Sequence, residues 1–136
     1  MVVRSCSKTD FWRKTFYGYI TDNGHFFYLE STGDFTFQAR INGEYAALYD
    51  QAGLMVRLDA ENWMKCGTEF FDGRRHASVV FTRDFSDWST MPDLSDTTGR
   101  NLRPYVKGIL YQEQKCAWES CVPHRRGPDS KPPSAI

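Results

Sequence analysis

Residues 63–70 could carry binding chemistry, because their alternation places an aromatic ring, an amine and a carboxyl on one face of an expected strand. These groups belong to Trp63, Lys65 and Glu69, and Gly67 leaves a gap where a ligand could approach the backbone. Side chains on one face of a strand lie about 6 to 7 Å apart. A sugar ring could therefore stack on Trp63 while Lys65 and Glu69 bond its hydroxyl groups. The alternative is a structural face, with Lys65 and Glu69 paired to neighbouring strands and Trp63 covering a core edge.

Two further groups extend this candidate site. Residues 45–51 offer hydroxyl, carboxylate and amide groups just before the strand expected around Gly53. Core packing of the tyrosines is an equally good interpretation. The composition of residues 86–93 predicts a long surface loop whose Asp87 and Trp88 could rim a pocket, although Asp87 could instead cap the backbone of the loop. The candidate ligand-binding residues are Tyr45, Tyr49, Asp50, Gln51, Trp63, Lys65, Glu69, Asp87 and Trp88.

Enzymatic chemistry finds less support in the sequence, and we predict no catalytic residue. A glycoside hydrolase needs two carboxyl groups, about 5 Å apart for retention or roughly 6.5 to 9.5 Å for inversion. Glu69 has no acidic partner on its own strand, and the three histidines, at positions 25, 76 and 124, have no Ser or Cys partner in a recognisable setting. A non-enzymatic binding module is therefore the leading interpretation. A hydrolase centred on Glu69 is the alternative.

The amino-acid composition limits the classes of partner and cofactor that we expect for this chain. The 17 basic and 17 acidic side chains balance, so the positive surplus that favours nucleic acid or an anionic membrane is absent. The four cysteines match no two-pair zinc spacing, and we expect reduced thiols with no metal or cofactor. No apolar run reaches the roughly 18 to 20 residues that cross a bilayer, and residues 1–10 lack the apolar core of a secretory signal. The sequence predicts a cytoplasmic protein with no membrane contact.

Period-two alternation dominates residues 26–83 and predicts short antiparallel strands. Strands are expected over residues 34–41, 45–49, 54–59, 63–70 and 76–82. Between them, the Asn-Gly and Asp-Gly pairs and the glycine at position 33 supply the positive φ that tight hairpins require. We therefore predict an all-β sandwich or barrel. The residues expected to share its core are Phe35, Phe37, Ile41, Leu54, Val56, Leu58, Val79 and Phe81.

Five blocks in a fixed order resemble the DUF1349 family. They read DFWR (10–13), GDF (33–35), YAALYDQAGLM (45–55), NWMKCGTE (62–69) and SDWS (86–89). The resemblance covers about residues 8–98. It implies an antiparallel concanavalin A-like jelly-roll sandwich, a lectin-like role in binding carbohydrate, and a link to regulation of the glycolytic enzyme enolase. It carries over no catalytic residue.

The chain departs from this family after residue 98. Residues 99–122 form a divergent segment in which residues 106–111 predict one further strand, and the Pro-rich composition of residues 123–136 predicts disorder. A splice variant, a frameshift or a faulty gene model would each produce such an altered carboxy terminus. We expect an incomplete sandwich that could self-associate through its uncovered sheet. A non-functional truncated isoform is the third interpretation.

Overall fold

The computed structural model describes residues 2–33, 35–39, 41–92, 105–108 and 114–121. The described residues form ten β-strands and no helix, and every strand pair is antiparallel. The all-β antiparallel fold expected from the sequence is therefore confirmed. None of the described residues belongs to a helix long and apolar enough to cross a membrane.

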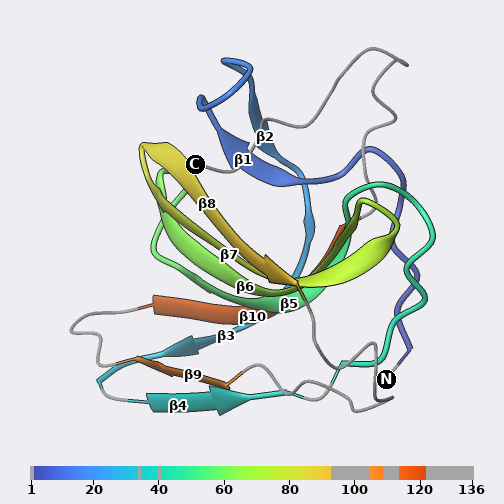
Figure 1. Cartoon of the computed structure of the whole chain (residues 1–136). Coiled ribbons are helices and arrows are strands. Elements are labelled where there is room, and N and C mark those ends of the chain that lie inside the picture. Colours follow the sequence, from blue (N-terminus) through green and yellow to red (C-terminus); the bar gives the residue numbers. More distant parts are fainter. Residues whose placement is uncertain (1, 34, 40, 93–104, 109–113, 122–136) are drawn as a thin grey trace.

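A curved six-stranded sheet is the main element of the fold (Figure 1). Its order is β3 (His25–Ser31), β10 (Gln114–Cys121), β5 (Asp50–Arg57), β6 (Asn62–Phe71), β7 (Arg74–Arg83) and β8 (Phe85–Pro92). The strands from β5 to β8 are successive hairpin neighbours, and the alternation of residues 54–82 predicted the first three of them, β5, β6 and β7. The β6–β7 turn contains Asp72 and Gly73, both with positive φ (51° and 73°), which Gly adopts without a steric penalty.

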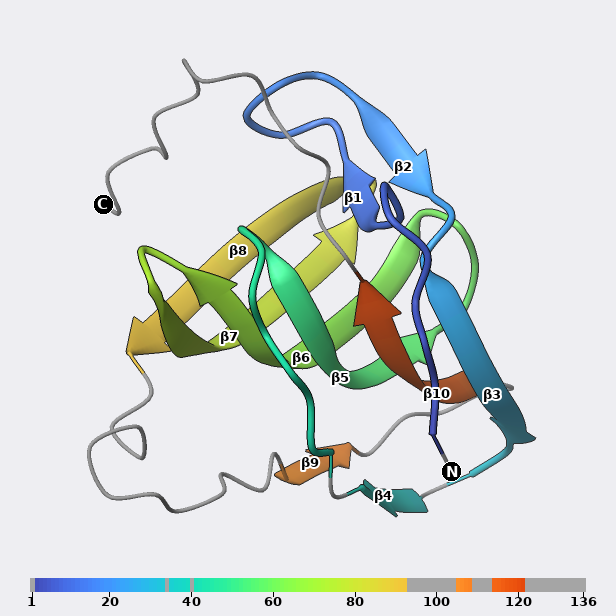
Figure 2. The same ribbon diagram turned by 90° about the vertical axis from the view of Figure 1, so that its right-hand side faces the viewer.

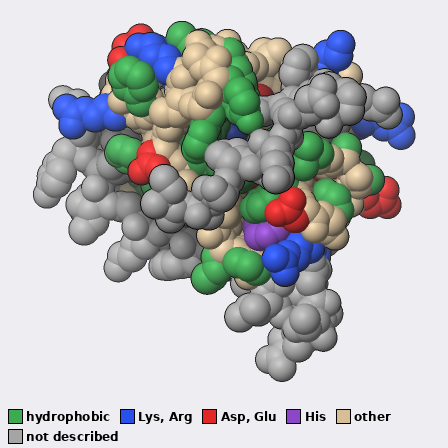
Figure 3. Space-filling view, turned by 45° about the horizontal axis from the view of Figure 1, so that its top comes forward, with side chains coloured by type: hydrophobic (Ala, Val, Ile, Leu, Met, Phe, Trp, Pro, Cys, Tyr) green, Lys and Arg blue, Asp and Glu red, His purple; other side chains and the backbone are tan. Residues whose placement is uncertain are grey.

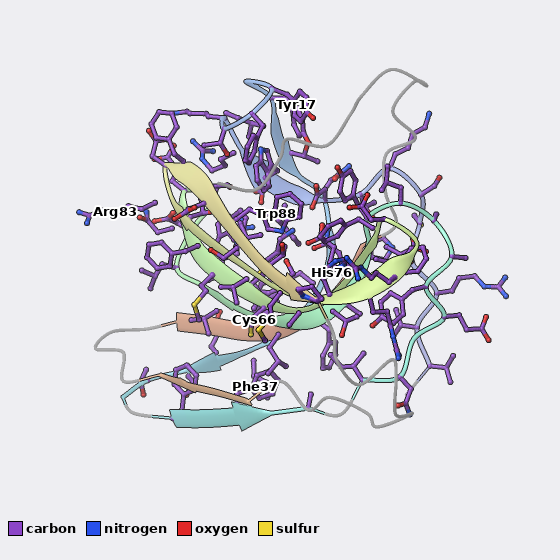
Figure 4. The ribbon with its side chains drawn as sticks, viewed as in Figure 1. Tyr17, Phe37, Cys66, His76, Arg83 and Trp88 are labelled. Carbon is purple, nitrogen blue, oxygen red and sulfur yellow. The ribbon has the colours of Figure 1, made fainter. Side chains whose placement is uncertain are left out.

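Two smaller sheets lie on opposite sides of this large sheet (Figure 2). The hairpin of β1 (Phe11–Arg13) and β2 (Ile20–Asp22) covers one face, which we call the inner face. The pair of β4 (Phe35–Gln38) and β9 (Tyr105–Gly108) lies on the other side, the outer face. Figure 4 shows Trp88 on the side of the hairpin and Cys66 on the side of Phe37 in β4.

The core lies on the inner face. Its buried cluster is formed by Phe11, Trp12, Met55, Trp63 and Val80. Of the residues expected in the core, Leu54 is buried, but its pairing with Cys66 places it on the outer face, and Phe35, Phe37, Ile41 and Val56 are half-buried. The prediction is wrong for Leu58, Val79 and Phe81, which are exposed.

Alternation along a strand assigns side chains to two faces, but it does not say which face another element will cover. On β7 the buried side chains are His76, Ser78, Val80 and Thr82, and Val80 packs in one cluster with Phe11 and Trp12 of β1. The side chains on the other face of β7 are more apolar. They include Val79 and Phe81, and both are exposed on the outer face of the sheet.

Two local predictions are also wrong. Residues 45–49 form no strand; they end in a turn at Ala47–Tyr49, where Tyr49 has a positive φ of 66°. Residues 86–92 are not a loop but most of β8, paired along its whole length with β7. The Ser, Asp and Thr residues that suggested a loop point in alternate directions along an edge strand, where polar side chains are tolerated.

The carboxy-terminal part contains β9, which overlaps the strand expected at residues 106–111, and a second strand, β10, that the sequence did not predict. The latter lies between β3 and β5 in the large sheet. The expected disordered tail, residues 123–136, lies outside the described residues.

Candidate functional site

A cavity of about 50 Å³ lies between the β1–β2 hairpin and the inner face of the large sheet. Aromatic side chains form most of its wall, and polar groups lie at its base on the sheet. The lining residues come from the hairpin, from the turn before β5, and from β5 to β8: Asp10, Trp12, Phe16, Tyr17, Tyr19, Tyr49, Gln51, Lys65, Glu69, Val80 and Trp88.

The aromatic wall is a connected set of rings. Trp12 stacks on Phe16 with ring centroids 5.7 Å apart, and Phe16 meets the Trp88 ring edge-on at 6.5 Å. Trp88 in turn packs edge-on against Tyr49 at 6.3 Å. Edge-to-face and offset-stacked pairs at such distances are favourable, so the rings support one another around the cavity.

The polar base contains two acids and one amine. Lys65 Nζ donates to Asp10 Oδ1 at 3.0 Å, and the amide of Gln51 donates to the same oxygen at 3.3 Å. Glu69 Oε2 accepts hydrogen bonds from Ser78 Oγ at 2.7 Å and from the Trp88 indole at 3.0 Å. The register places Gln51, Lys65, Glu69, Ser78 and Trp88 on one face through the β5–β6, β6–β7 and β7–β8 pairings, and Asp10 reaches them from the residue before β1.

Burial dominates the electrostatics of Glu69. Loss of water around its carboxyl raises the pKa of Glu69 above its ordinary value, since the charged form is the better solvated one. The hydrogen bond from Ser78, the charge of Lys65 and the Trp88 indole oppose this shift, whereas the charge of Asp10 adds to it. The protonation of this carboxyl in the cavity therefore depends on the charges that lie near it.

A network around Arg13 fixes the hairpin over the cavity. The Arg13 backbone N–H donates to Ser86 Oγ at 2.9 Å, and its guanidinium donates to the Glu61 and Asp84 carboxylates at 2.9 and 3.0 Å. The hydroxyl of Thr15 donates to the Ser86 carbonyl at 2.6 Å. These bonds hold β1 against the edge strand β8, and they fix the position of the hairpin over the cavity.

The tip of the hairpin presents aromatic side chains to the outside. Phe16 and Tyr17 are both exposed although they also line the cavity. The end of the molecule that carries the hairpin shows hydrophobic side chains at the surface beside charged ones (Figure 3), and Tyr17 stands at this end in Figure 4. The cavity mouth is thus bordered by accessible rings.

The structure brings five of the nine candidate residues to this cavity: Tyr49, Gln51, Lys65, Glu69 and Trp88. Trp63 shares the inner face with Lys65 and Glu69 but is only 4% exposed, with its ring packed edge-on against Phe11 at 6.2 Å. A ring so deeply buried offers no surface for a sugar to stack on. Trp63 therefore fits the alternative interpretation, in which its ring covers part of the core. The gap expected at Gly67 is also absent, because a Cβ there would collide with the backbone of Ala52 and Gly53.

The other three candidates lie away from the cavity lining. Asp50 Oδ2 accepts from the backbone N–H groups of Ala46 and Ala47 at 2.8 and 2.7 Å, so it stabilises the turn before β5. Burial raises the pKa of the Tyr45 hydroxyl, which hydrogen-bonds to Thr68. Asp87 is exposed, and the strand alternation points it to the face opposite Trp88.

Sequence reasoning missed the residues that the hairpin supplies. Asp10 and Trp12 belong to the DFWR block, and the dense aromatic run at residues 16–19 was the signal that could have drawn attention to the rest. The hairpin residues lie about fifty positions before Lys65 and Glu69 in the chain, and nothing in the sequence indicated that the two sets of residues meet in one cavity. Within the described residues, no group of three or more His, Cys, Asp or Glu side chains could hold a metal ion.

The fold is an antiparallel β-sandwich with a small cavity of aromatic wall and polar base on the inner face of its main sheet. A family model described as "Protein of unknown function (DUF1349)" matches residues 1–107, and the chain belongs to that family. The resemblance found in the sequence is thereby confirmed.

Two curated relatives are fungal. "Regulation of enolase protein 1" from Saccharomyces cerevisiae is 54% identical over 104 residues, which cover 76% of this chain and 52% of the yeast protein. An uncharacterized protein from Emericella nidulans is 34% identical over 65 residues, 45% of this chain and 32% of that protein. The chain therefore spans about half the length or less of these relatives. The crystal structure of a functionally unknown protein from Saccharomyces cerevisiae matches with a TM-score of 0.74 and 35% identity, covering 87% of this chain and 76% of that one.

Proposed function

We propose that the chain is a non-enzymatic regulatory module whose cavity binds a carbohydrate. The observation that carries this proposal is the combination of an aromatic wall with a polar base in one cavity. Sugars present apolar C–H faces and hydroxyl edges, so they suit sites where rings and convergent hydrogen-bonding groups meet. The yeast relative is named for regulation, which supports a regulatory rather than a catalytic role.

The cavity volume limits how such a ligand enters. About 50 Å³ holds one or two water molecules, or the substituent at one edge of a sugar, but not a whole ring. We therefore place the ring at the mouth, against Phe16 and Tyr17, with one substituent directed toward Lys65 and Glu69. In this arrangement the hairpin tip, rather than Trp63, supplies the stacking surface.

A titration with monosaccharides tests this arrangement. Tyr17→Ala removes an exposed ring at the mouth and should weaken binding by about tenfold, in line with the roughly 1 to 1.5 kcal/mol of an aromatic contact. Tyr28→Ala is the matched control, because Tyr28 is similarly exposed (44% against 47%) but lies on β3, away from the cavity lining. Equal effects of the two substitutions, or no binding by the wild type, would refute the proposal.

The regulated partner is, in this proposal, a metabolic enzyme such as enolase. The name of the yeast relative supports this partner, and a glycolytic partner implies action in the cytoplasm. Purified enolase and the purified chain should co-elute in size-exclusion chromatography, with and without the sugar. Elution of both proteins at their individual volumes across micromolar concentrations would exclude this partner.

Self-association is the competing use of the exposed part of the outer face, where Val79 and Phe81 on β7 are accessible. Light scattering on the chain alone should give a mass above that of one chain, and Phe81→Ser should restore the mass of the monomer. A monomer in the wild type would rule this out.

The hydrolase alternative gains one observation from the structure. Asp10 supplies the second carboxyl that Glu69 lacks on its own strand, and both line the cavity. A buried acid with a raised pKa beside a second carboxylate is the pattern of a general acid and its partner. Hydrolysis of aryl glycosides by the wild type, abolished in Glu69→Gln, would establish this alternative in place of the binding role.

A further inference from the structure

The charged groups in the cavity are unevenly distributed. Two carboxyl groups, from Asp10 and Glu69, and one amine, from Lys65, line it, so the lining carries a net charge of −1 when Glu69 is ionised. The Lys65 amine is already ion-paired to Asp10 at 3.0 Å and lies 5.7 Å from the centroid of the Trp63 ring. The charge of Lys65 also acts on Glu69, so one amine serves two carboxyl groups and the lining keeps a surplus of one acid beside the aromatic wall.

We propose that the ligand of this cavity is an amino sugar whose protonated amine enters beside Glu69, within the cage formed by the aromatic side chains. This inference rests on the proposed function, because it names the class of carbohydrate that the same site would bind. The six rings are those of Trp12, Phe16, Tyr17, Tyr19, Tyr49 and Trp88.

The chemistry of the wall favours a cation over a neutral hydroxyl group. The faces of Trp, Tyr and Phe rings carry negative electrostatic potential and attract an ammonium group within about 6 Å of a ring centroid. An ammonium group also donates up to three hydrogen bonds, and carboxylate oxygens accept charge-assisted bonds more strongly than neutral ones. A hydroxyl group in the same place would gain neither the ring attraction nor the charge pairing.

The size of the cavity is consistent with this ligand. An ammonium group and the carbon that bears it are small enough for about 50 Å³, while the sugar ring remains at the mouth. Glu69 and Lys65 are 6% and 5% exposed, so a cation that reaches them is largely removed from water. Electrostatic attraction is stronger in such surroundings than at the surface.

Binding should also depend on pH through Glu69. Burial raises the pKa of its carboxyl, and a cation beside it would favour the ionised form. The titratable groups around it come from each element at the cavity: Lys65 on its own strand, Asp10 before β1, Tyr17 and Tyr19 of the hairpin, His76 across the pair with β7, and Tyr49 before β5. Affinity should rise as the pH increases through the pKa of Glu69, until the ligand amine itself loses its proton.

Calorimetric titration of the wild-type chain with matched ligands tests the inference without any substitution. Glucosamine, galactosamine and mannosamine are each compared with the neutral parent sugar and with the N-acetyl derivative, which keeps the nitrogen but not its charge. We expect at least one protonated amino sugar to bind about tenfold more tightly than its two neutral counterparts, a difference of about 1.4 kcal/mol. Equal binding of amine and neutral forms would overturn this inference and leave the carbohydrate proposal standing. Failure of every sugar to bind would overturn both.

Glu69→Gln then assigns the preference to its carboxyl. This variant should bind the amino sugar no better than the neutral parent and should lose the rise in affinity with pH. Asp87→Asn is the control, because the same change of carboxyl to amide occurs on an exposed residue outside the cavity lining. Retention of the full preference in Glu69→Gln would overturn the role given to Glu69, and the wild-type comparison above decides the inference even if this variant does not fold.

Discussion

Two adjacent valines on β7 test which face of the main sheet forms the core. Val80 is 2% exposed beneath the β1–β2 hairpin, whereas Val79 is 41% exposed on the outer face. Substitution by Ala removes the same two carbon groups from the same strand at each position. The loss of strand propensity is therefore shared, and the difference between the variants reports burial.

The magnitude follows from the exposed fractions. Each buried CH₂ contributes about 0.8 kcal/mol, so Val80→Ala should cost about 1.6 kcal/mol from transfer, plus a cavity contribution that brings it to about 2 kcal/mol. Val79→Ala should cost about half as much, because much of that side chain is already hydrated and water fills the space. A difference of about 1 kcal/mol corresponds to roughly 4 °C in Tm for a chain of this length.

Thermal and urea unfolding of both variants, at a concentration where chromatography shows one species, measures this difference. We expect Val80→Ala to melt below Val79→Ala, with both below the wild type. If Val79→Ala were equally or more destabilising, the outer face would be the covered one. The assignment of the core to the inner face would then be wrong.

Three further outcomes follow from buried or charged groups. Arg13→Met should lower the free energy of unfolding by about 1 to 2 kcal/mol in urea, because its carboxylate partners are partly exposed and the loss is moderated by solvent; an unchanged midpoint would show that the guanidinium ion pairs do not stabilise the hairpin. The raised pKa of Glu69 means that the folded chain binds its proton more tightly than the unfolded chain, so this contribution to stability is present below the ordinary value of 4.5 and is lost as the pH rises through the raised pKa. Glu69→Gln should therefore lose less stability than the wild type between acidic and neutral pH in parallel urea titrations, and identical pH profiles would contradict this. Burial raises the pKa of the Cys66 thiol to about 11, so peptide mapping after iodoacetamide treatment should find the exposed Cys6 modified first, and faster labelling of Cys66 would refute its burial.

The local structure of the central strands was contained in the sequence. Alternation and turn chemistry predicted β6 and β7 with their Asp72-Gly73 turn, because side-chain period and positive φ are properties of neighbouring residues. The same alternation placed Lys65 and Glu69 on one face, and the structure brings both to one cavity. The order of the five sequence blocks also identified the family.

Long-range packing decided which face of the main sheet is covered and which distant residues meet in the cavity. Both faces of β7 carry apolar side chains, and only the position of the β1–β2 hairpin made Val80 a core residue and Val79 an exposed one. The same hairpin covered Trp63, which the sequence offered as a stacking platform, and brought Asp10 to within 3.0 Å of Lys65 from 55 positions away. The residues of a strand determine which of its side chains share a face. Which segment covers that face depends on contacts between residues far apart in the sequence. The site could therefore be located in the sequence only on the strands that form its base.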